Sequence, residues 1–224
     1  GGIAMKVLGI SGSPIRDGNT DRALRTALSA TGTETEFLKL IDYTVAPCKA
    51  CLGCLKTNTC VIKDDGILLA QMAKEADALI IAGYTPYSSL DSRTKAFIER
   101  LYPLRHIHGF MRGKPGGAIV TCAIHSGAES LPPAGDMGAN AIMFYMMEEG
   151  MDYQGSVKVL GNVPCVKCGS GDSCEMSAVK LIYGPDATVE SAGINVIETQ
   201  SAAMKEIEAL GARIGDALRR RGSA

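Results

Sequence analysis

Short apolar segments alternate along this chain with longer segments of helical periodicity, and this alternation constrains the fold more than any other feature. The apolar segments are nearly continuous aliphatic runs, which is typical of strands buried on both faces. We expect five of them: Lys6–Ile10, Glu36–Leu40, Asp77–Ala82, Gly117–Cys122 and Val157–Leu160. Strands that alternate with helices form a parallel sheet covered by helices on both faces. The sequence therefore predicts a doubly wound α/β fold.

The helical segments carry apolar side chains at intervals of three and four residues, which places those side chains on one face. They cover residues 21–30, a segment that begins near Asp64 or Asp65, and residues 91–102, 139–147 and 198–221. In the second of these helices we expect the inward face to consist of Ile67, Leu68, Met72 and Ala76. Residues 161–197 show no clear period, so we expect an excursion that carries cysteines before the last helix.

The composition is that of one α/β domain covering residues 1–224, with 46% hydrophobic residues. A net charge of −1 argues against a nucleic-acid partner and against a membrane-surface role. No apolar run is long enough to span a bilayer, and the amino end lacks the features of a signal peptide. We therefore expect a cytoplasmic protein, in which the eight cysteines are ligands or redox groups rather than structural disulfides.

Four cysteines follow the second predicted strand in one compact run, Cys48, Cys51, Cys54 and Cys60. A loop of this length can wrap its thiolates around a [4Fe–4S] cluster, whereas structural zinc more often uses two cysteine pairs separated by a longer loop. Lys49 and Lys56 would offset part of the negative charge of such a cluster. Zinc, a disulfide and free thiols remain the alternatives.

The loop after the first strand is rich in hydroxyls and glycine and leads into a helix. Backbone N–H groups at a helix start, joined by side-chain hydroxyls, form a cradle for a phosphate. The loop has neither the glycine pattern of a dinucleotide site nor the Gly-Lys-Ser/Thr of a nucleoside triphosphate site. A phosphate monoester held without a lysine or Mg²⁺ fits FMN, and an ordinary strand-to-helix turn is the alternative reading.

These segments together resemble the iron–sulfur flavoprotein branch of the NADPH-dependent FMN reductase and flavodoxin-like superfamily. The resemblance rests on residues 9–14 with 18–20, the four cysteines, and residues 64–66, 78–89 and 95–100, and it covers residue 5 to about residue 160. It implies a five-stranded sheet of order 2-1-3-4-5, with the cysteine-rich loop after strand 2. It also implies that the FMN phosphate is held by Ser11, Ser13, Pro14, Asn19 and Thr20, and the flavin ring by Thr85, Pro86, Tyr87, Ser88 and Ser89.

Two more features lie where the fourth strand ends. Cys122 closes this strand, and His125 follows in a loop where relatives usually carry glycines, so Ala123 and Ile124 depart from the pattern. His125 could bond a flavin carbonyl, lie near the cysteines, or be a loop histidine without a special role. We include Cys122 and His125 among the candidate cofactor contacts.

A second cysteine set, Cys165, Cys168 and Cys174, repeats the spacing of Cys51, Cys54 and Cys60. Three thiols call for a fourth ligand to zinc or to a second cluster, and Cys122 or His125 could supply it from the same sheet edge. Free thiols on a glycine-rich loop are the alternative.

The function that the resemblance implies is electron transfer through a [4Fe–4S] cluster and FMN. The donor would be a ferredoxin-like carrier and the acceptor oxygen, peroxide or a quinone-like molecule. One alternative is an NAD(P)H-dependent FMN or quinone reductase whose cysteines bind zinc or remain free. Another is a redox- or metal-sensing flavin-binding protein.

We also expect a homodimer or a homotetramer. The cysteine loop leaves the sheet at the edge that carries the flavin loops, but a loop of this size could reach away from its own FMN. In the family the cluster of one chain faces the FMN of another. The expected subunit contacts are the 84–90 loop and some of Met143, Met146 and Met147.

Overall fold

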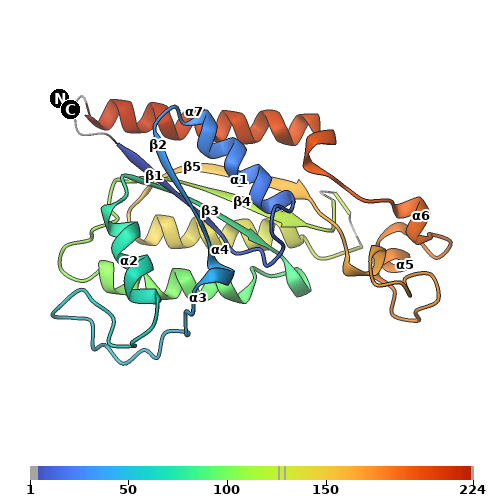
Figure 1. Cartoon of the computed structure of the whole chain (residues 1–224), viewed down its shortest axis with the longest axis horizontal. Helices are drawn as coiled ribbons and strands as arrows, with labels where there is room; N and C mark the ends of the chain where they lie inside the picture. The colour runs from blue at the N-terminus through green and yellow to red at the C-terminus, as the bar shows by residue number, and fades with distance from the viewer. Residues whose placement is uncertain (1–4, 126, 129, 223–224) are drawn as a thin grey trace.

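The computed structural model describes residues 5–125, 127–128 and 130–222, and a five-stranded parallel sheet lies at its centre (Figure 1). The strand order is β2-β1-β3-β4-β5. This order confirms the prediction of a flavodoxin-like sheet. The strands are β1 (Lys6–Ser11), β2 (Glu34–Lys39), β3 (Ala78–Tyr84), β4 (Pro115–Cys122) and β5 (Asp152–Leu160).

The register brings the carboxyl ends of the strands to one edge. Ser11 pairs with Lys39 and with Ala82, and Cys122 pairs with Leu160. The segments that follow β1, β3, β4 and β5 therefore leave the sheet side by side. In flavodoxin-like folds this edge is the ligand-binding one.

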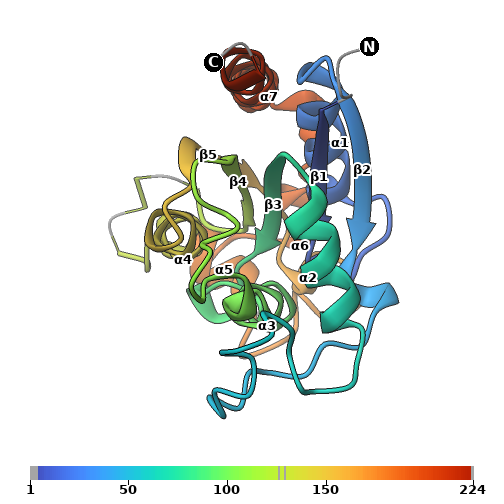
Figure 2. The ribbon, with the colours of Figure 1, turned by 90° about the vertical axis from the view of Figure 1, so that its left-hand side faces the viewer.

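Helices cover both faces of the sheet, as Figures 1 and 2 show. On one face lie α2 (Gly66–Glu75), α3 (Ser92–Arg100) and α4 (Ala134–Glu148), and on the other α1 (Asn19–Ala30) and α7 (Ser201–Gly222). Successive side chains of β3 point to opposite faces of the sheet, so this one strand contributes to both cores. Leu79 and Ile81 join the core beneath α2, α3 and α4, whereas Ile80 and Ala82 join the core beneath α1 and α7.

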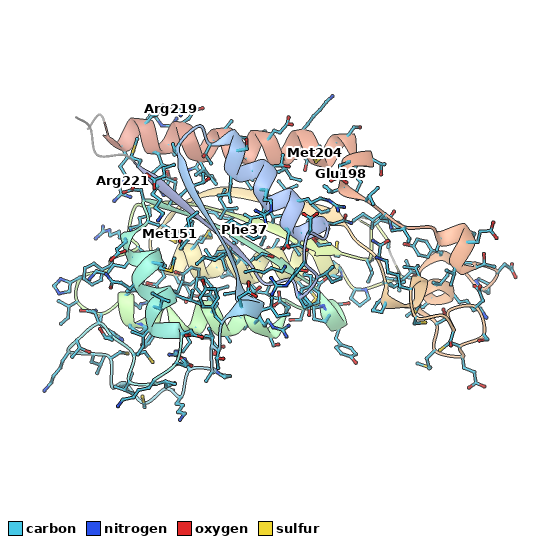
Figure 3. All side chains as sticks on the ribbon, in the orientation of Figure 1. Phe37, Met151, Glu198, Met204, Arg219 and Arg221 are labelled. Atoms are coloured by element: carbon cyan, nitrogen blue, oxygen red, sulfur yellow. The ribbon has the colours of Figure 1, made fainter. Side chains whose placement is uncertain are left out.

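The last helix, α7, packs closely against α1. A Cβ atom at Gly215 would lie 2.1 Å from the carbonyl oxygen of Thr31, so only glycine permits this approach. Figure 3 labels Met204 near the beginning of α7 and Arg219 near its end. Arg219 donates to the same carbonyl oxygen of Thr31 at 3.4 Å. The contact fixes α1, whose first turn follows the predicted phosphate loop.

Several details differ from the sequence expectations. The buried face of α2 includes Leu69, Ala70 and Ala73, which were not predicted, and Leu68 is 51% exposed, so the prediction is wrong for Leu68. Ala76 is buried as predicted, and Met72 packs against the same core. Met146 is fully buried inside the chain, which removes it from any subunit contact. The 161–197 excursion contains two short helices, α5 (Ala178–Tyr183) and α6 (Val189–Ala192).

In the part of the chain that the structure describes, no helix is both long and apolar enough to cross a bilayer.

Candidate flavin and cysteine sites

The loop after β1 passes close to the start of α3 before it enters α1. A Cβ atom at Gly12 would lie 1.8 Å from Thr94 Oγ1, so this approach requires glycine. Ser13 Oγ accepts a hydrogen bond from the backbone N–H of Ile15 at 3.2 Å. Within the described part of the chain, the start of α1 has no side-chain cap at Gly18, so its first N–H groups could bind an anion. This arrangement suits a phosphate.

A buried ion pair underlies the same loop. Lys39 Nζ lies 2.7 Å from Asp21 Oδ2, with the two side chains 5% and 1% exposed. The ammonium also donates to the carbonyl oxygens of Ser13 and Ile15, at 2.8 and 2.9 Å. Lys39 therefore shapes the loop from beneath and neutralises a carboxylate that would repel a phosphate. No sequence pattern marks this lysine, because its partners lie far away in the chain.

Several predicted phosphate ligands have partners within the protein. Ser11 Oγ donates to Asp21 Oδ1 at 2.6 Å, and Thr20 Oγ1 lies 2.9 Å from Thr121 Oγ1. Asn19 Nδ2 donates to the carbonyl oxygen of Asn195 at 2.8 Å. Ser11 and Thr20 thus connect strands and helix, and Asn19 holds the end of the 161–197 excursion. Pro14 lies between Ser13 and Ile15 in the loop.

The loop after β3 contains strained backbone and an unpaired buried hydroxyl. Tyr87 and Ser88 have φ values of 50° and 58°, in the left-handed region, and the Tyr87 side chain is fully exposed. Thr85 Oγ1 is buried and has no hydrogen-bond partner among the described residues. Strain of this kind collects at ligand sites. Together with Pro86 and Ser89, these residues could hold a flavin ring. The flavin would accept a hydrogen bond from the Thr85 hydroxyl and would lie over the Tyr87 side chain.

Asp91 links this loop to α3. Its carboxylate accepts hydrogen bonds from the backbone N–H of Tyr84 at 3.2 Å and from Thr94 Oγ1 at 2.7 Å. Burial raises the pKa of the Asp91 carboxyl above its usual range. The residue therefore fixes the exit of β3 relative to the start of α3.

Cys122 and His125 border a third loop of the same edge. The Cys122 thiol is buried, donates to the carbonyl oxygen of Ile124 at 3.2 Å, and packs against Gly135 of α4. Burial raises the pKa of this thiol. His125 and Lys158 line a pocket of about 300 Å³. Residues 126 and 129 of this loop lie outside the described residues.

The four cysteines of the first set line one small cavity of about 20 Å³, and its walls include Arg100, Tyr102 and Pro103. These wall residues belong to the end of α3 and the turn that follows it. In Figure 1 the cysteine loop lies below α2, at the opposite end of α3 from the loop after β3. The loop leaves β2 at the flavin edge but carries its thiols away from it.

Arg100 anchors both ends of the cysteine loop and is almost fully buried. It donates to the carbonyl oxygen of Ala46 before the loop at 2.9 Å and to that of Ile62 after it at 3.3 Å. Its guanidinium also forms a bidentate pair with Asp64, both bonds being 2.7 Å, and this pair lowers the pKa of the Asp64 carboxyl. Arg100 Nε is buried without a hydrogen-bond partner in the described part of the chain.

Asn58 and His106 hold the middle of the same loop. Asn58 Nδ2 donates to the carbonyl oxygens of Pro103 and His106, at 2.8 and 2.7 Å. His106 Nε2 lies 3.3 Å from Cys54 Sγ, and burial raises the pKa of that thiol. Arg100, Asn58 and His106 are site residues that no motif in the sequence marks.

The donor set at this cavity fits a thiolate-ligated cluster. Four thiols share one cavity, and the orphaned N–H of Arg100 could donate to a sulfur there. No three His, Cys, Asp or Glu side chains within residues 5–125, 127–128 and 130–222 are already arranged around a common point as a metal site. Binding would therefore draw the thiols together.

With this geometry established, comparison with known proteins identifies the family. Residues 5–148 match the family described as NADPH-dependent FMN reductase. The chain belongs to this family. The match confirms the fold and supports FMN as the flavin.

Curated relatives of this family member include several iron–sulfur flavoproteins. The one from Methanocaldococcus jannaschii is 39% identical over 129 residues, covering 56% of this chain and 66% of that protein. One from Archaeoglobus fulgidus is 35% identical over 53% of this chain and 55% of that protein. One from Methanosarcina thermophila is 31% identical over 56% of this chain and 67% of that protein. These relatives confirm the predicted branch, although the first two matches span less than two thirds of each relative.

Solved structures support the fold alone. RosB with a bound intermediate aligns with a TM-score of 0.63 at 16% identity, over 97% of this chain and 80% of RosB. An FMN-dependent NADH-azoreductase from Bacillus anthracis, in complex with FMN, aligns with a TM-score of 0.60 at 11% identity, over 94% of this chain and 99% of that one.

Proposed function

We propose that this protein is an FMN-dependent oxidoreductase that transfers electrons between a [4Fe–4S] cluster and FMN. The observation that carries the proposal is the shared cavity lined by Cys48, Cys51, Cys54 and Cys60, in a chain of an FMN reductase family. When bound, the cluster would supply one-electron transfer and the flavin two-electron chemistry. The protein would set their positions and their surroundings.

The flavin end of the proposed site uses residues from two strand ends. The N–H groups at the start of α1 and the hydroxyl of Ser13 would hold the phosphate, while Lys39 keeps the Asp21 carboxylate neutralised beneath it. The buried hydroxyl of Thr85 would donate to a flavin heteroatom, since it has no other partner among the described residues. The exposed Tyr87 ring would shield the flavin from water.

The cysteine end of the proposed site places one buried cation beside four thiols. The Arg100 guanidinium lines their cavity, and a positive charge there favours thiolates and a negatively charged cluster. Asn58 and His106 would limit the movement of the loop when it loses or gains charge.

The separation of the two ends supports an oligomeric enzyme. The nine residues of α3, about 13 Å of helix, lie between the Tyr84–Asp91 loop and the cavity beside Arg100. We propose that the cysteine site of one chain faces the flavin of another in a homodimer or homotetramer. The exposed side chains of Tyr87, Phe144 and Met147 are the apolar surface that such a contact would cover.

The proposed donor is a ferredoxin-like protein and the proposed acceptor is oxygen, peroxide or a quinone-like molecule, as the resemblance implies. A second candidate is an NAD(P)H-dependent FMN reductase whose cysteines bind zinc, which the description of the family favours. The third is the redox- or metal-sensing protein.

The cluster is tested by anaerobic purification followed by absorption spectroscopy and by iron, zinc and sulfide analysis. We expect about four iron and four sulfide at this site, lost in Cys54→Ala but kept in Leu55→Ala, a neighbouring exposed position. FMN should remain bound in both variants. Stoichiometric zinc without sulfide would favour the reductase, and FMN without donor-linked turnover would favour the sensor.

The flavin site is tested by titration with FMN and with FAD. Ser13→Ala and Thr85→Val should each weaken FMN binding about tenfold, on the scale of one lost hydrogen bond. Ser29→Ala, an exposed position in α1, is the control and should leave the affinity unchanged. FAD should bind more weakly than FMN, because the cradle suits a terminal phosphate. An unchanged FMN affinity in both variants would contradict the site.

A further inference from the structure

The excursion between β5 and α7 is closed at its base by two asparagines. Asn162 Nδ2 donates to the carbonyl oxygen of Asn195 at 2.8 Å, and the backbone N–H of Asn195 donates to Asn162 Oδ1 at 2.7 Å. Asn195 Nδ2 also donates to the carbonyl oxygen of Gly161 at 3.0 Å. Asn19 of α1 bonds this base as well. Residues 163–194, called the head below, therefore form a closed loop that is attached beside the flavin edge.

The head has very little apolar core of its own. Among its described hydrophobic side chains, only those of Val163 and Val179 are buried, whereas Met176 and Leu181 are 88% and 70% exposed. Its helices, α5 and α6, have six and four residues. Units of fewer than about 40 residues usually need a disulfide, a metal or a partner to stay folded. Apolar burial therefore contributes little to the head, which is held mainly by polar contacts such as the hydrogen bond from the backbone N–H of Val189 to Asp172 Oδ1 at 2.6 Å.

Three cysteines lie where such support is needed. The backbone N–H of Ala178 donates to Cys165 Sγ, and that of Ser170 donates to Cys168 Sγ, both at 3.4 Å. The backbone N–H of Cys174 donates to the carbonyl oxygen of Ser170 at 3.0 Å. Hydrogen bonds from N–H groups to sulfur are a feature of metal-thiolate sites. The first cysteine loop shows the same contact, from the N–H of residue 50 to the first thiol at 3.4 Å.

A buried hydroxyl without a partner gives a second, independent indication of a ligand. Ser177 is 4% exposed, and its Oγ has no hydrogen-bond partner within the described residues. Its backbone N–H donates to the carbonyl oxygen of Cys174 at 3.3 Å, and the next N–H in the chain is the one directed at Cys165. The hydroxyl thus belongs to the turn that joins the first and last of the three cysteines. A thiolate or a metal-bound ligand there would give it an acceptor.

We propose that Cys165, Cys168 and Cys174 form a second metal centre, which holds the head together. The ligand is a thiophilic metal, either a zinc ion or the iron of an iron–sulfur cluster. The three thiolates leave one coordination position for a ligand from outside the head. Cys122, considered above as a fourth ligand, instead packs against Gly135 of α4. The two loops share the spacing C-x2-C-x5-C. Within the described residues neither set of thiols is already gathered around a common point, so metal binding would draw them together.

The test separates the second centre from the first by removing the first. In the 224-residue chain with Cys48, Cys51, Cys54 and Cys60 all changed to alanine, anaerobic purification should leave either about one zinc or about four iron and four sulfide per chain. Adding Cys165→Ala and Cys168→Ala should remove that metal, whereas adding Ser173→Ala, an exposed position in the same loop, should not. FMN binding and circular dichroism would verify that the variants are folded.

A second comparison keeps the test valid where the quadruple variant fails to fold. In the otherwise native chain, the double variant Cys165→Ala with Cys168→Ala should contain less metal than the Ser173→Ala variant. The difference should equal the metal content that the quadruple variant retains. Hydrogen exchange in residues 163–194 should rise at least tenfold in the double variant, with the sheet unchanged. Equal metal contents in these two chains, or a folded quadruple variant without metal, would overturn the proposal. These results do not depend on whether the first loop holds its cluster.

Discussion

Replacing Arg100 by methionine should weaken the attachment of the cysteine loop while leaving the sheet intact. The guanidinium connects α3 to both ends of this loop, through Ala46, Ile62 and Asp64. Methionine fills much of the same space but provides no donor. The change therefore removes four hydrogen bonds and one charge from a buried position.

The expected cost follows from what remains around Asp64. Removing one partner of a buried ion pair destabilises a protein by about 3–5 kcal/mol. Here the two side chains are 1% and 9% exposed. Asp64 would keep two backbone donors, the N–H groups of Ala46 and Gly66, so we expect the lower end, about 3 kcal/mol. With a urea dependence of about 2–3 kcal/mol per M, the unfolding midpoint should fall by about 1 M.

The dependence on pH provides a second measurement. The Arg100 guanidinium holds the pKa of Asp64 below its unfolded value, so the pair stabilises the fold above the unfolded pKa of about 3.9. That stabilisation is lost as the pH falls through the lower, folded pKa. The unfolding free energy of the native chain should therefore fall in this acid range more steeply than that of Arg100→Met.

Three variants show which property of Arg100 matters. Arg100→Lys keeps the charge but cannot reach all the acceptors at once, so it should lose less than Arg100→Met. Adding Asp64→Asn to Arg100→Met removes the unpaired charge and should restore part of the stability. Arg93→Met, an exposed position on the same helix, should change stability by less than about 0.5 kcal/mol. A loss below 1 kcal/mol in Arg100→Met, or no recovery in the double variant, would refute this reasoning.

Three further changes test the fold around the proposed site. Lys39→Met should lower the free energy of unfolding in urea by about 3–5 kcal/mol, because it leaves the Asp21 carboxylate buried and unpaired. Adding Asp21→Asn should recover part of this loss. A Lys39→Met variant as stable as the native chain would contradict the prediction. Gly215→Ala should cost about 1–3 kcal/mol because its Cβ would meet the carbonyl oxygen of Thr31, and an unchanged thermal midpoint would show that α7 can move away. Phe144→Glu should dissociate the proposed oligomer in light scattering at micromolar concentration, and a native chain that is already monomeric would exclude that interface.

The sheet could be predicted because each strand is an uninterrupted apolar run whose side chains serve both layers. Helix boundaries were harder to predict. The helix α4 begins at Ala134, five residues before the expected start at residue 139. Gly135 and Gly138 interrupt the apolar period in this segment, but a Cβ atom at these positions would lie 2.9 Å from the Lys158 side chain and 2.7 Å from the Thr85 side chain, respectively. A glycine that lowers helix propensity was thus required by tertiary packing.

The positions of the candidate loops could be predicted where they depend on strand ends, and the contacts that hold them could not, because these join residues far apart in the chain. Ser13 and Thr85 follow neighbouring parallel strands, so the topology places their loops at one edge. Lys39 pairs with a residue 18 positions away and Arg100 with one 36 positions away. No periodicity marks such pairs, and a lysine at the end of a strand or an arginine in the last turn of a helix usually indicates solvent exposure. Asn58 and His106 were missed for the same reason.

The two ends of α3 explain why one helix can position both proposed redox sites. Asp91 caps its start and fixes the loop after β3, while Arg100 lies in its last turn and fixes the cysteine loop. Each charge is placed where the helix dipole favours it, and each is buried. The helix therefore holds the two loops at a set distance within one chain, and a shorter path between them requires a neighbouring chain. A change in α3 should consequently alter both sites, whereas a change in either loop should alter one.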